Sequence, residues 1–362
     1  MSTLLALLLS LFVAFFLIFG TAVEPTARPT VATVEAMEAL AIEDEPIERL
    51  ALPTGDYSNA YVASSESLFE QNSSSAWIRI ADAPPVGEII FDGADPDVIL
   101  VGDEGDCFRG GGGAAFQSSI DGGQSWTEAT GDSQFIRPLA VWSESDLIVG
   151  AGCEGLLVSR DLGESWTIVA DDLLGLSVTG FATIENREQT VLAGLTGEGG
   201  TSRLYELDLS ESGETTVEEP LLEYYGIGAL AGYEDRIFVG SITGVSSSFD
   251  GGETWVVDRA GLEDVTLERD PLVDGLPADL DPSNYGLYAL ALDEGNPLLV
   301  SSATSLFEHW STDIRPADMP MWEDLGSVGS TIRAFVALPQ ESSVLAQADG
   351  MVFPIVPESV DS

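Results

Sequence analysis

The chain has 362 residues, 44% of them apolar, and it carries 61 acidic residues against 13 basic ones. Its formal net charge of −48 at pH 7 repels phosphate backbones and anionic lipid headgroups, which argues against binding to nucleic acid or to a membrane face. The 38 glycines and 18 prolines favour many short strands and turns over helices.

The first residues indicate export. Leu4 to Gly20 are almost wholly apolar, and Gly20-Thr21-Ala22 supplies the small residues that a signal peptidase requires. Extended through Val23, the apolar run reaches about 20 residues, which is long enough to cross a bilayer. A cleaved signal peptide and an uncleaved N-terminal anchor therefore both remain open.

The expected organisation has four parts. Residues 1–22 are the signal peptide or anchor, residues 23–44 a linker rich in Pro, Thr and Glu, residues 45–357 a repeat region, and residues 358–362 a tail. We expect the folded part to lie outside the cytoplasm, either secreted, periplasmic or anchored by the N-terminal segment.

Three segments along the repeat region share one pattern. They are SSIDGGQSW (Ser118–Trp126), VSRDLGESW (Val158–Trp166) and SSFDGGETW (Ser247–Trp255), and a worn copy, LDLSESGETT (Leu207–Thr216), falls between the last two. Alternating and β-rich runs separated by turns precede each copy. Each repeat therefore predicts four short strands within about 40 to 50 residues, a period typical of propeller blades or solenoid coils.

The repeats predict an all-β fold, a seven-bladed β-propeller, with six blades as the alternative. The last repeat, which begins near residue 330, lacks a fourth strand. An open edge would be left unpaired there, so a strand from residues 29–41 is expected to complete this blade and close the ring. The chain is expected to be a monomer.

The shared pattern is suited to reversing two antiparallel strands. Its glycines permit positive φ, its aspartates accept bonds from turn N–H groups, and its tryptophans can pack between blades. The residues with these structural roles are Asp121, Gly123, Trp126, Asp161, Gly163, Trp166, Asp250, Gly252 and Trp255. We therefore expect the repeated segment to be a turn and not a reactive site.

These segments resemble the Asp-box, or BNR, repeat of sialidases, sortilin-type receptors, some polysaccharide hydrolases and photosystem assembly factors. The resemblance covers most of residues 45–357 and implies a β-propeller with each box on an outer hairpin, away from the ligand face. A sialidase would also need an arginine triad and a Phe/Tyr-Arg-Ile-Pro motif before the first box. Here the nearest string is FIRP, Phe135–Pro138, which is transposed and follows a box.

No other catalytic motif stands out. The single histidine, His309, leaves little for a zinc site or a Ser-His-Asp triad. Two acidic loops offer oxygen ligands but lack the spacing of an EF-hand. Their residues are Asp92, Asp95, Asp97, Asp279, Asp281, Ser283 and Asn284. We expect no cofactor and no metal, with structural calcium as the alternative.

The two cysteines, Cys107 and Cys153, each follow the second predicted strand of neighbouring blades. Equivalent loops share a face, so in an exported chain they predict a disulfide, with two unpaired thiols as the alternative. The bridge would hold a Gly-rich loop over the face that carries ligands in most propellers. Residues on that face are the candidate ligand-binding set: Asp103, Glu104, Asp106, Arg109, Arg137, Glu154 and Arg333.

The predicted function is a non-catalytic platform whose loops bind a protein or a glycan outside the cytoplasm. The alternative is a secreted glycoside hydrolase of sialidase-like architecture, with Arg137 and Arg333 at the channel mouth. It would require two carboxylates flanked by aromatic residues and arginine. A purely structural envelope protein is the third class, and it would show neither a pocket nor a sizeable apolar patch.

Overall fold

The structure is a computed structural model of the chain. The residues it describes are 30–31, 41–42, 45–46, 49–51, 61–64, 67–71, 77–80, 87–103, 114–129, 135–185, 187–197, 200–210, 217, 219–268, 286–293, 296–302, 305–309, 322–327, 332–338, 343–348, 351–355 and 357–358. Residues 1–29, which contain the predicted signal peptide or anchor, lie outside this set. Within it, no helix is long and apolar enough to cross a membrane.

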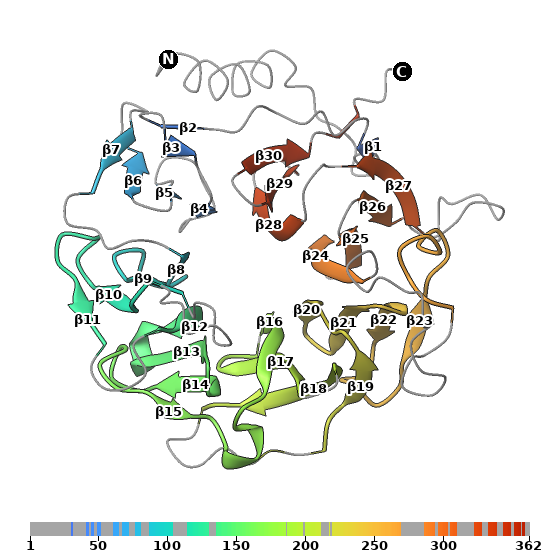
Figure 1. Ribbon diagram of the computed structural model, residues 1–362, viewed down its shortest axis with the longest axis horizontal. Coiled ribbons are helices and arrows are strands. Elements are labelled where there is room, and N and C mark those ends of the chain that lie inside the picture. Colours follow the sequence, from blue (N-terminus) through green and yellow to red (C-terminus); the bar gives the residue numbers. More distant parts are fainter. Residues whose placement is uncertain are drawn as a thin grey trace.

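Small antiparallel sheets follow one another around a ring in chain order (Figure 1). We number them as sheets 1 to 7. Sheet 1 contains β4 (Arg49–Ala51), β5 (Tyr61–Ala63), β6 (Leu68–Gln71) and β7 (Trp77–Arg79); sheet 2 contains β8 (Glu88–Phe91), β9 (Ile99–Gly102), β10 (Gln117–Ser119) and β11 (Thr127–Glu128); sheet 3 contains β12 (Arg137–Trp142), β13 (Leu147–Gly152), β14 (Gly155–Ser159) and β15 (Thr167–Ile168).

The second half of the ring continues the same order. Sheet 4 contains β16 (Ser177–Glu185), β17 (Thr190–Thr196), β18 (Thr201–Asp208) and β19 (Leu222–Tyr225); sheet 5 contains β20 (Ala229–Tyr233), β21 (Arg236–Ser241), β22 (Gly244–Ser248) and β23 (Val256–Asp258); sheet 6 contains β24 (Leu287–Asp293), β25 (Asn296–Ser302), β26 (Ser305–His309) and β27 (Trp322–Ser327); sheet 7 contains β28 (Ile332–Leu338), β29 (Ser343–Ala348) and β30 (Met351–Ile355). Sheets 4 and 5 are joined because β16 pairs with β20 in parallel.

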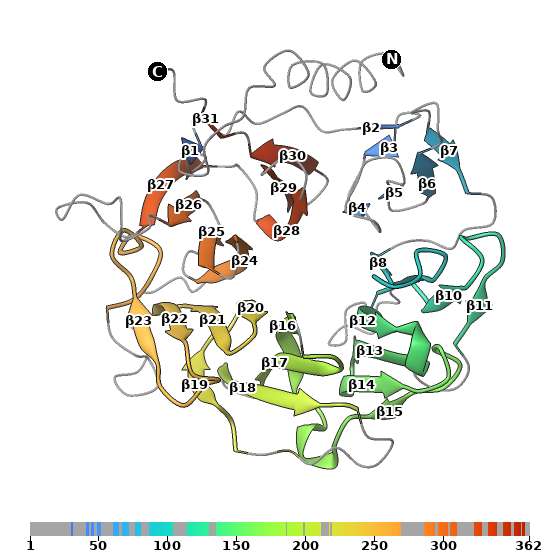
Figure 2. The same ribbon diagram turned by 180° about the vertical axis from the view of Figure 1, so that it is seen from behind.

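Each sheet begins with its innermost strand and ends at the outside of the ring, as Figures 1 and 2 show from opposite sides. The second and third strands are covered by the neighbouring sheets on both faces. This explains their nearly continuous apolar runs, such as the wholly buried β9 (ILVG) and β14 (GLLVS). The outermost strands β11 and β23 are mostly exposed.

The hydrophobic core lies between successive sheets and not at the centre of the ring. Between sheets 2 and 3, for example, Leu100, Phe116, Ile136 and Ile148 are fully buried in one cluster. Similar clusters lie between each pair of neighbours from sheet 1 to sheet 6. Burying one such side chain stabilises the fold by about 1.5 to 3 kcal/mol, so the contacts between sheets hold the ring together.

The all-β prediction is confirmed. In sheet 4, however, the outer strand is β19 (Leu222–Tyr225), which pairs with β18. β19 follows the worn copy at Leu207–Thr216, and residues 211–216 of that copy lie outside the described set. The predicted ring-closing region contains β1 (Thr30–Val31), which pairs with β31 (Pro357–Glu358) and not with β30. β2 (Ala41–Ile42) pairs with β3 (Glu45–Pro46). Seven blades, with six as the alternative, stays a prediction.

Candidate functional site

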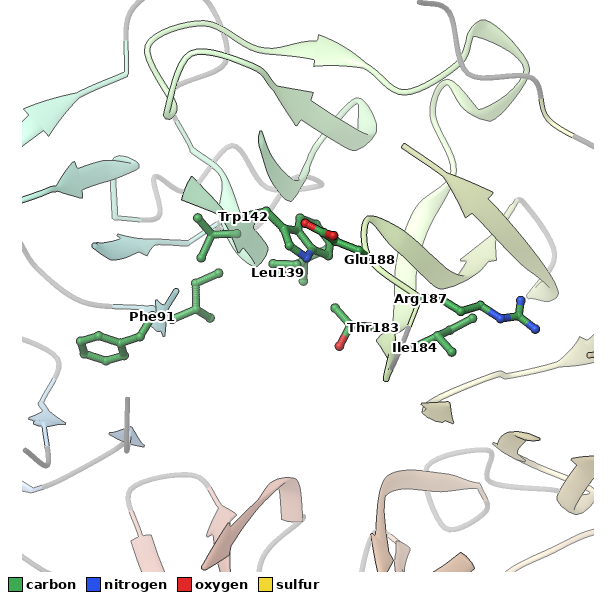
Figure 3. A pocket seen from close by; sticks show the side chains of 10 residues that line it. Phe91, Leu139, Trp142, Thr183, Ile184, Arg187 and Glu188 are labelled. Carbon is green, nitrogen blue, oxygen red and sulfur yellow. The ribbon is translucent and has the colours of Figure 1, made fainter. Parts of the chain in front are cut away.

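A pocket lies where the innermost strands of sheets 2, 3 and 4 end (Figure 3). Its volume is about 690 Å³, which is within the range of small-molecule and peptide side-chain sites. It is lined by residues from β8, from β12, from β16 and from the turn after β16: Ile90, Phe91, Leu139, Ala140, Val141, Trp142, Thr183, Ile184, Arg187 and Glu188.

Seven of the ten lining residues have apolar side chains, but polar atoms make up more of the pocket's exposed surface than apolar atoms do. Ala140, Val141 and Ile184 are buried, while Trp142 is half-buried and also packs against the core between sheets 3 and 4. Because that packing fixes the indole, the aromatic part of the wall is rigid. Glu188 is exposed, so the polar groups of the pocket include a solvated carboxylate.

A β-bulge in β12 helps to place the wall. The pairing of β12 with β13 skips one residue between Pro138 and Ala140, so Leu139 has no direct partner. A bulge of this kind bends the strand and re-aims the following side chains. Leu139 and the rest of the strand to Trp142 all line the pocket.

Hydrogen bonds tie together the turns beside the pocket. Asp92 follows β8 and is 4% exposed; its Oδ2 accepts a bond from the backbone N–H of Ser143 in sheet 3 (2.5 Å) and its Oδ1 one from Ala94 (2.8 Å). The turn after β16 is linked to sheet 3 in the same way, because the side-chain amide of Gln189 donates to the hydroxyl of Ser145 (2.8 Å). Three successive sheets are therefore joined at this end of the ring.

Arg187 carries the same linkage into sheet 5. Its guanidinium pairs with Glu206 of β18 (2.8 Å) and with Asp235 in the turn after β20 (2.5 Å). In Figure 3 this side chain points away from Trp142 and Phe91. Arg187 therefore links sheets 4 and 5, and its positive charge is balanced by two carboxylates.

The three repeated segments all form turns between the third and fourth strands of sheets 2, 3 and 5. In the first, the hydroxyl of Ser119 donates to Asp121 (2.8 Å) and accepts from the N–H of Gly123 (2.8 Å), while Asp121 accepts from the N–H of Ser125 (2.8 Å). The other two turns repeat these bonds through Asp161 and Asp250. Both carboxylate oxygens are used within each turn.

These bonds lower the pKa values of the turn carboxyls. The hydroxyl of Ser125 has the largest effect on the pKa of Asp121, and that of Thr254 on the pKa of Asp250. For Asp161, burial raises the pKa, but the bonds from Ser165 and Ser159 outweigh it, so its pKa is also lowered. All three aspartates are thus held in the ionised form.

The tryptophans of these turns lie against the preceding sheet. Trp126 packs on the cluster between sheets 1 and 2, Trp166 on the one between sheets 2 and 3, and Trp255 on the one between sheets 4 and 5. Trp166 meets the ring of Phe116 edge to face, with centroids 4.9 Å apart. The turns therefore connect neighbouring sheets at the outside of the ring.

The predicted ligand-binding residues that the structure describes lie at the other end of the inner strands. Arg137 begins β12, whereas the pocket lies where β12 ends, and its guanidinium donates to the carbonyl of Val178 (3.3 Å). Asp103 follows β9, and Glu154 lies in the turn between β13 and β14, both at the same end as Arg137. Glu104, Asp106 and Arg109 lie outside the described residues, as does the side chain of Arg333.

The predicted disulfide involves this same end. Cys153 lies exposed in the turn between β13 and β14, and the described part of the chain contains no free cysteine. Cys107 lies outside the described residues. The pairing of Cys107 with Cys153 stays a prediction.

The described residues contain no group of acidic, histidine and cysteine side chains that could hold a metal ion. In the first acidic loop the carboxylates cap backbone N–H groups instead: Asp95 accepts from Asp97 (3.1 Å), as Asp92 does from Ala94 and Ser143. The second loop, Asp279 to Asn284, lies outside the described residues.

Sequence reasoning missed the pocket. A local signal existed, because the alternating run LAVW ends in Trp142 at the end of a predicted inner strand. This run alone does not reveal that the ends of β8 and β16, which lie about 50 and 40 residues from Trp142 in the chain, line the same pocket as Trp142. That depends on how the sheets are arranged.

Solved structures similar to this chain are β-propellers. A structure described as YCF48 bound to D1 peptide matches with a TM-score of 0.53 and 13% identity over 93% of this chain and 100% of that chain. The Dos1 propeller matches with a TM-score of 0.51 and 10% identity over 86% of this chain and 78% of that one. A GH74 xyloglucanase from Xanthomonas campestris has a TM-score of 0.48 and 15% identity over 83% and 50%.

No family model and no curated protein matches the sequence. At these identities the structural likeness concerns the fold alone. It confirms the predicted fold class: this chain folds as a β-propeller.

Proposed function

We propose that this propeller is a non-catalytic platform that binds a segment of a partner protein in the pocket at the ends of β8, β12 and β16. The observation that carries the proposal is the pocket itself, about 690 Å³, with Phe91, Leu139 and Trp142 among its lining residues and Trp142 packed against the core. Rigid aromatic side chains in concave sites are typical anchors for a partner's side chain.

The pocket does not include the residues of the hydrolase alternative. Arg137 and Arg333 lie at the start of their inner strands, at the opposite end from the pocket. A glycoside hydrolase also needs one carboxylic acid kept protonated by a raised pKa. The hydrolase therefore stays the competing class, and the substrate screen below tests it.

Three further features complete the proposal. The repeated turns are Asp-box turns, supported by their identical hydrogen-bond pattern at three positions. The platform acts outside the cytoplasm as a monomer, supported by the apolar segment from Leu4 to Gly20 and by the cysteine pattern. Any attachment to a membrane is through the N-terminal segment alone, and a cleaved signal peptide is the alternative.

Site-specific photo-crosslinking in cells tests the proposal. A photoreactive residue in place of Glu188, which is exposed and lines the pocket, is expected to form an adduct with one partner protein. The matched control is Glu253, which is also exposed and lies in the outer turn of sheet 5. Thr183→Trp adds bulk at an exposed pocket position and is expected to abolish the adduct without disturbing the core. Equal adducts from both positions, unaffected by Thr183→Trp, would contradict the proposal.

A glycan-array and glycosidase-substrate screen of the full chain separates the remaining classes. The proposal expects neither turnover nor pocket-dependent glycan binding. Turnover of any glycoside would overturn the non-catalytic assignment. Glycan binding that Thr183→Trp abolishes would make the pocket a lectin-like site in place of a protein-binding one.

A further inference from the structure

The charges around the pocket identify the kind of partner that fits it. Four turns lie at the pocket end of the inner strands. Three directly follow strands that line the pocket, 92–98 after β8, 143–146 after β12 and 187–190 after β16, and the fourth, 234–236, follows β20, whose end pairs with the end of β16. They contain eight acidic residues and two arginines. The acidic residues are Asp92, Asp95, Asp97, Glu144, Asp146, Glu188, Glu234 and Asp235.

The acids provide the exposed charge, whereas the arginine at the pocket is already paired. Seven of the eight carboxylates are exposed, Asp92 being the exception. Arg187 is held by Glu206 and Asp235 at 2.8 and 2.5 Å, so it offers little free positive charge to a ligand. These turns therefore give the pocket a net negative rim.

From this arrangement we infer that the pocket takes a basic segment of its partner: an apolar or aromatic side chain inserted between β12 and β16, flanked by arginine or lysine residues that face the acidic rim. This inference rests on the proposed function and specifies its ligand. Complementary charges around an apolar anchor steer association and fix register. A second copy of this chain is a poor occupant, because two chains of charge −48 repel each other.

Fluorescence anisotropy with short labelled peptides tests the inference on the full-length chain. The probes are Arg-Gly-Phe-Gly-Arg, Ser-Gly-Phe-Gly-Ser, Glu-Gly-Phe-Gly-Glu and Arg-Gly-Gly-Gly-Arg. The first is expected to bind at least about tenfold more tightly than the second in about 0.02 M salt, and the difference should largely vanish in about 0.5 M salt, where the charges are screened. The peptide without phenylalanine should bind more weakly than the first.

Two double variants distinguish a local rim from the overall negative charge. Glu144→Gln with Glu188→Gln removes two rim charges, and Glu128→Gln with Glu253→Gln removes two exposed charges at the outside of the ring. Only the rim pair is expected to reduce the preference for the basic peptide, by several-fold, with thermal stability unchanged. Thr183→Trp should abolish binding of every phenylalanine peptide.

The outcomes separate this inference from the proposed function. Equal binding of the serine and arginine peptides, lost in Thr183→Trp, would overturn the basic-partner inference and leave the pocket as a binding site. An equal loss of the preference for the basic peptide in both double variants would also overturn the inference. The preference would then reflect only the net charge of the chain. If Thr183→Trp changes the binding of none of the peptides, both the inference and the proposed function fail.

Discussion

Gly163→Ala tests whether the repeated turns hold neighbouring sheets together. Gly163 has a φ of +93°, and a Cβ at this position would lie 2.3 Å from Cε1 and 2.8 Å from Cζ of Phe116. Phe116 directly precedes β10 of sheet 2, is fully buried and packs against Trp166. The substituted side chain would therefore push directly on the contact between sheets 2 and 3.

The expected cost has two parts. An L-residue at positive φ lowers the free energy of unfolding by about 1 to 2 kcal/mol. Displacing a packed core ring lowers it by about 1 to 3 kcal/mol more. The free energy of unfolding should therefore fall by about 2 to 5 kcal/mol. Gly175→Ala is the matched control: Gly175 has a φ of +76°, but a Cβ there meets nothing within 4 Å, so only the first part of the cost applies.

The measurement is urea denaturation of both variants and of the wild type under oxidising conditions, with unfolding monitored by tryptophan fluorescence. We expect Gly163→Ala to lower the unfolding midpoint clearly more than Gly175→Ala does. The double variant Gly163→Ala with Phe116→Leu removes the ring that the new methyl group meets, so the cost of Gly163→Ala should be smaller in the Phe116→Leu background. Equal costs for the two glycine variants would refute the reasoning, because the turn would then add no tight contact between the sheets.

Three other predictions follow from the structure. Asp92→Ala leaves the N–H groups of Ala94 and Ser143 without their acceptor, and it should cost about 1 to 3 kcal/mol in denaturant unfolding; an unchanged midpoint would show that these bonds do not link the sheets. The pKa of Asp161 is lowered in the fold, so its stabilising effect is present above its unfolded pKa of about 3.9 and lost as pH falls further. The difference in melting temperature between wild type and Asp161→Asn should be constant above about pH 5 and shrink below about pH 4, whereas a constant difference down to pH 3 would contradict the shift. Finally, intact mass spectrometry after thiol alkylation should show no alkylated cysteine until a reductant is added, because Cys107 and Cys153 are predicted to be paired; two labelled thiols without reductant would exclude the bridge.

The fold class was predictable because its signals are local. β14 is a buried apolar run, as a strand in the middle of a sheet requires, and β11 is polar and exposed, as a strand at the outside of the ring requires. Each pattern is present in a few consecutive residues. In the repeated turns, the Asp carboxylates and the N–H groups of Gly123, Gly163 and Gly252 bond to residues within four positions in the chain. The sequence therefore contained both the strands and their turns.

The outer strand of sheet 4 was harder to place from sequence. The worn copy at Leu207–Thr216 keeps an Asp-Leu-Ser and a Gly-Glu-Thr-Thr string but has lost the tryptophan of the other copies, so it does not mark where the fourth strand begins. In the structure β19 begins at Leu222, where it pairs with β18. Pairing selects the segment whose side chains fit the neighbouring sheet, and a degenerate local pattern does not reveal that fit.

The binding site depended on tertiary structure in a way that no motif records. Trp142, Thr183 and Phe91 are separated by about 40 to 90 residues, yet they line one pocket because three inner strands end together. The sequence by itself determined the strands, the turns and the strongly negative charge, since these follow from short-range pattern and composition. Only the tertiary structure decided that the pocket lies at the opposite end from Arg137 and Glu154, and that Arg187 is engaged by Glu206 and Asp235, because the ring of sheets brings distant strand ends together.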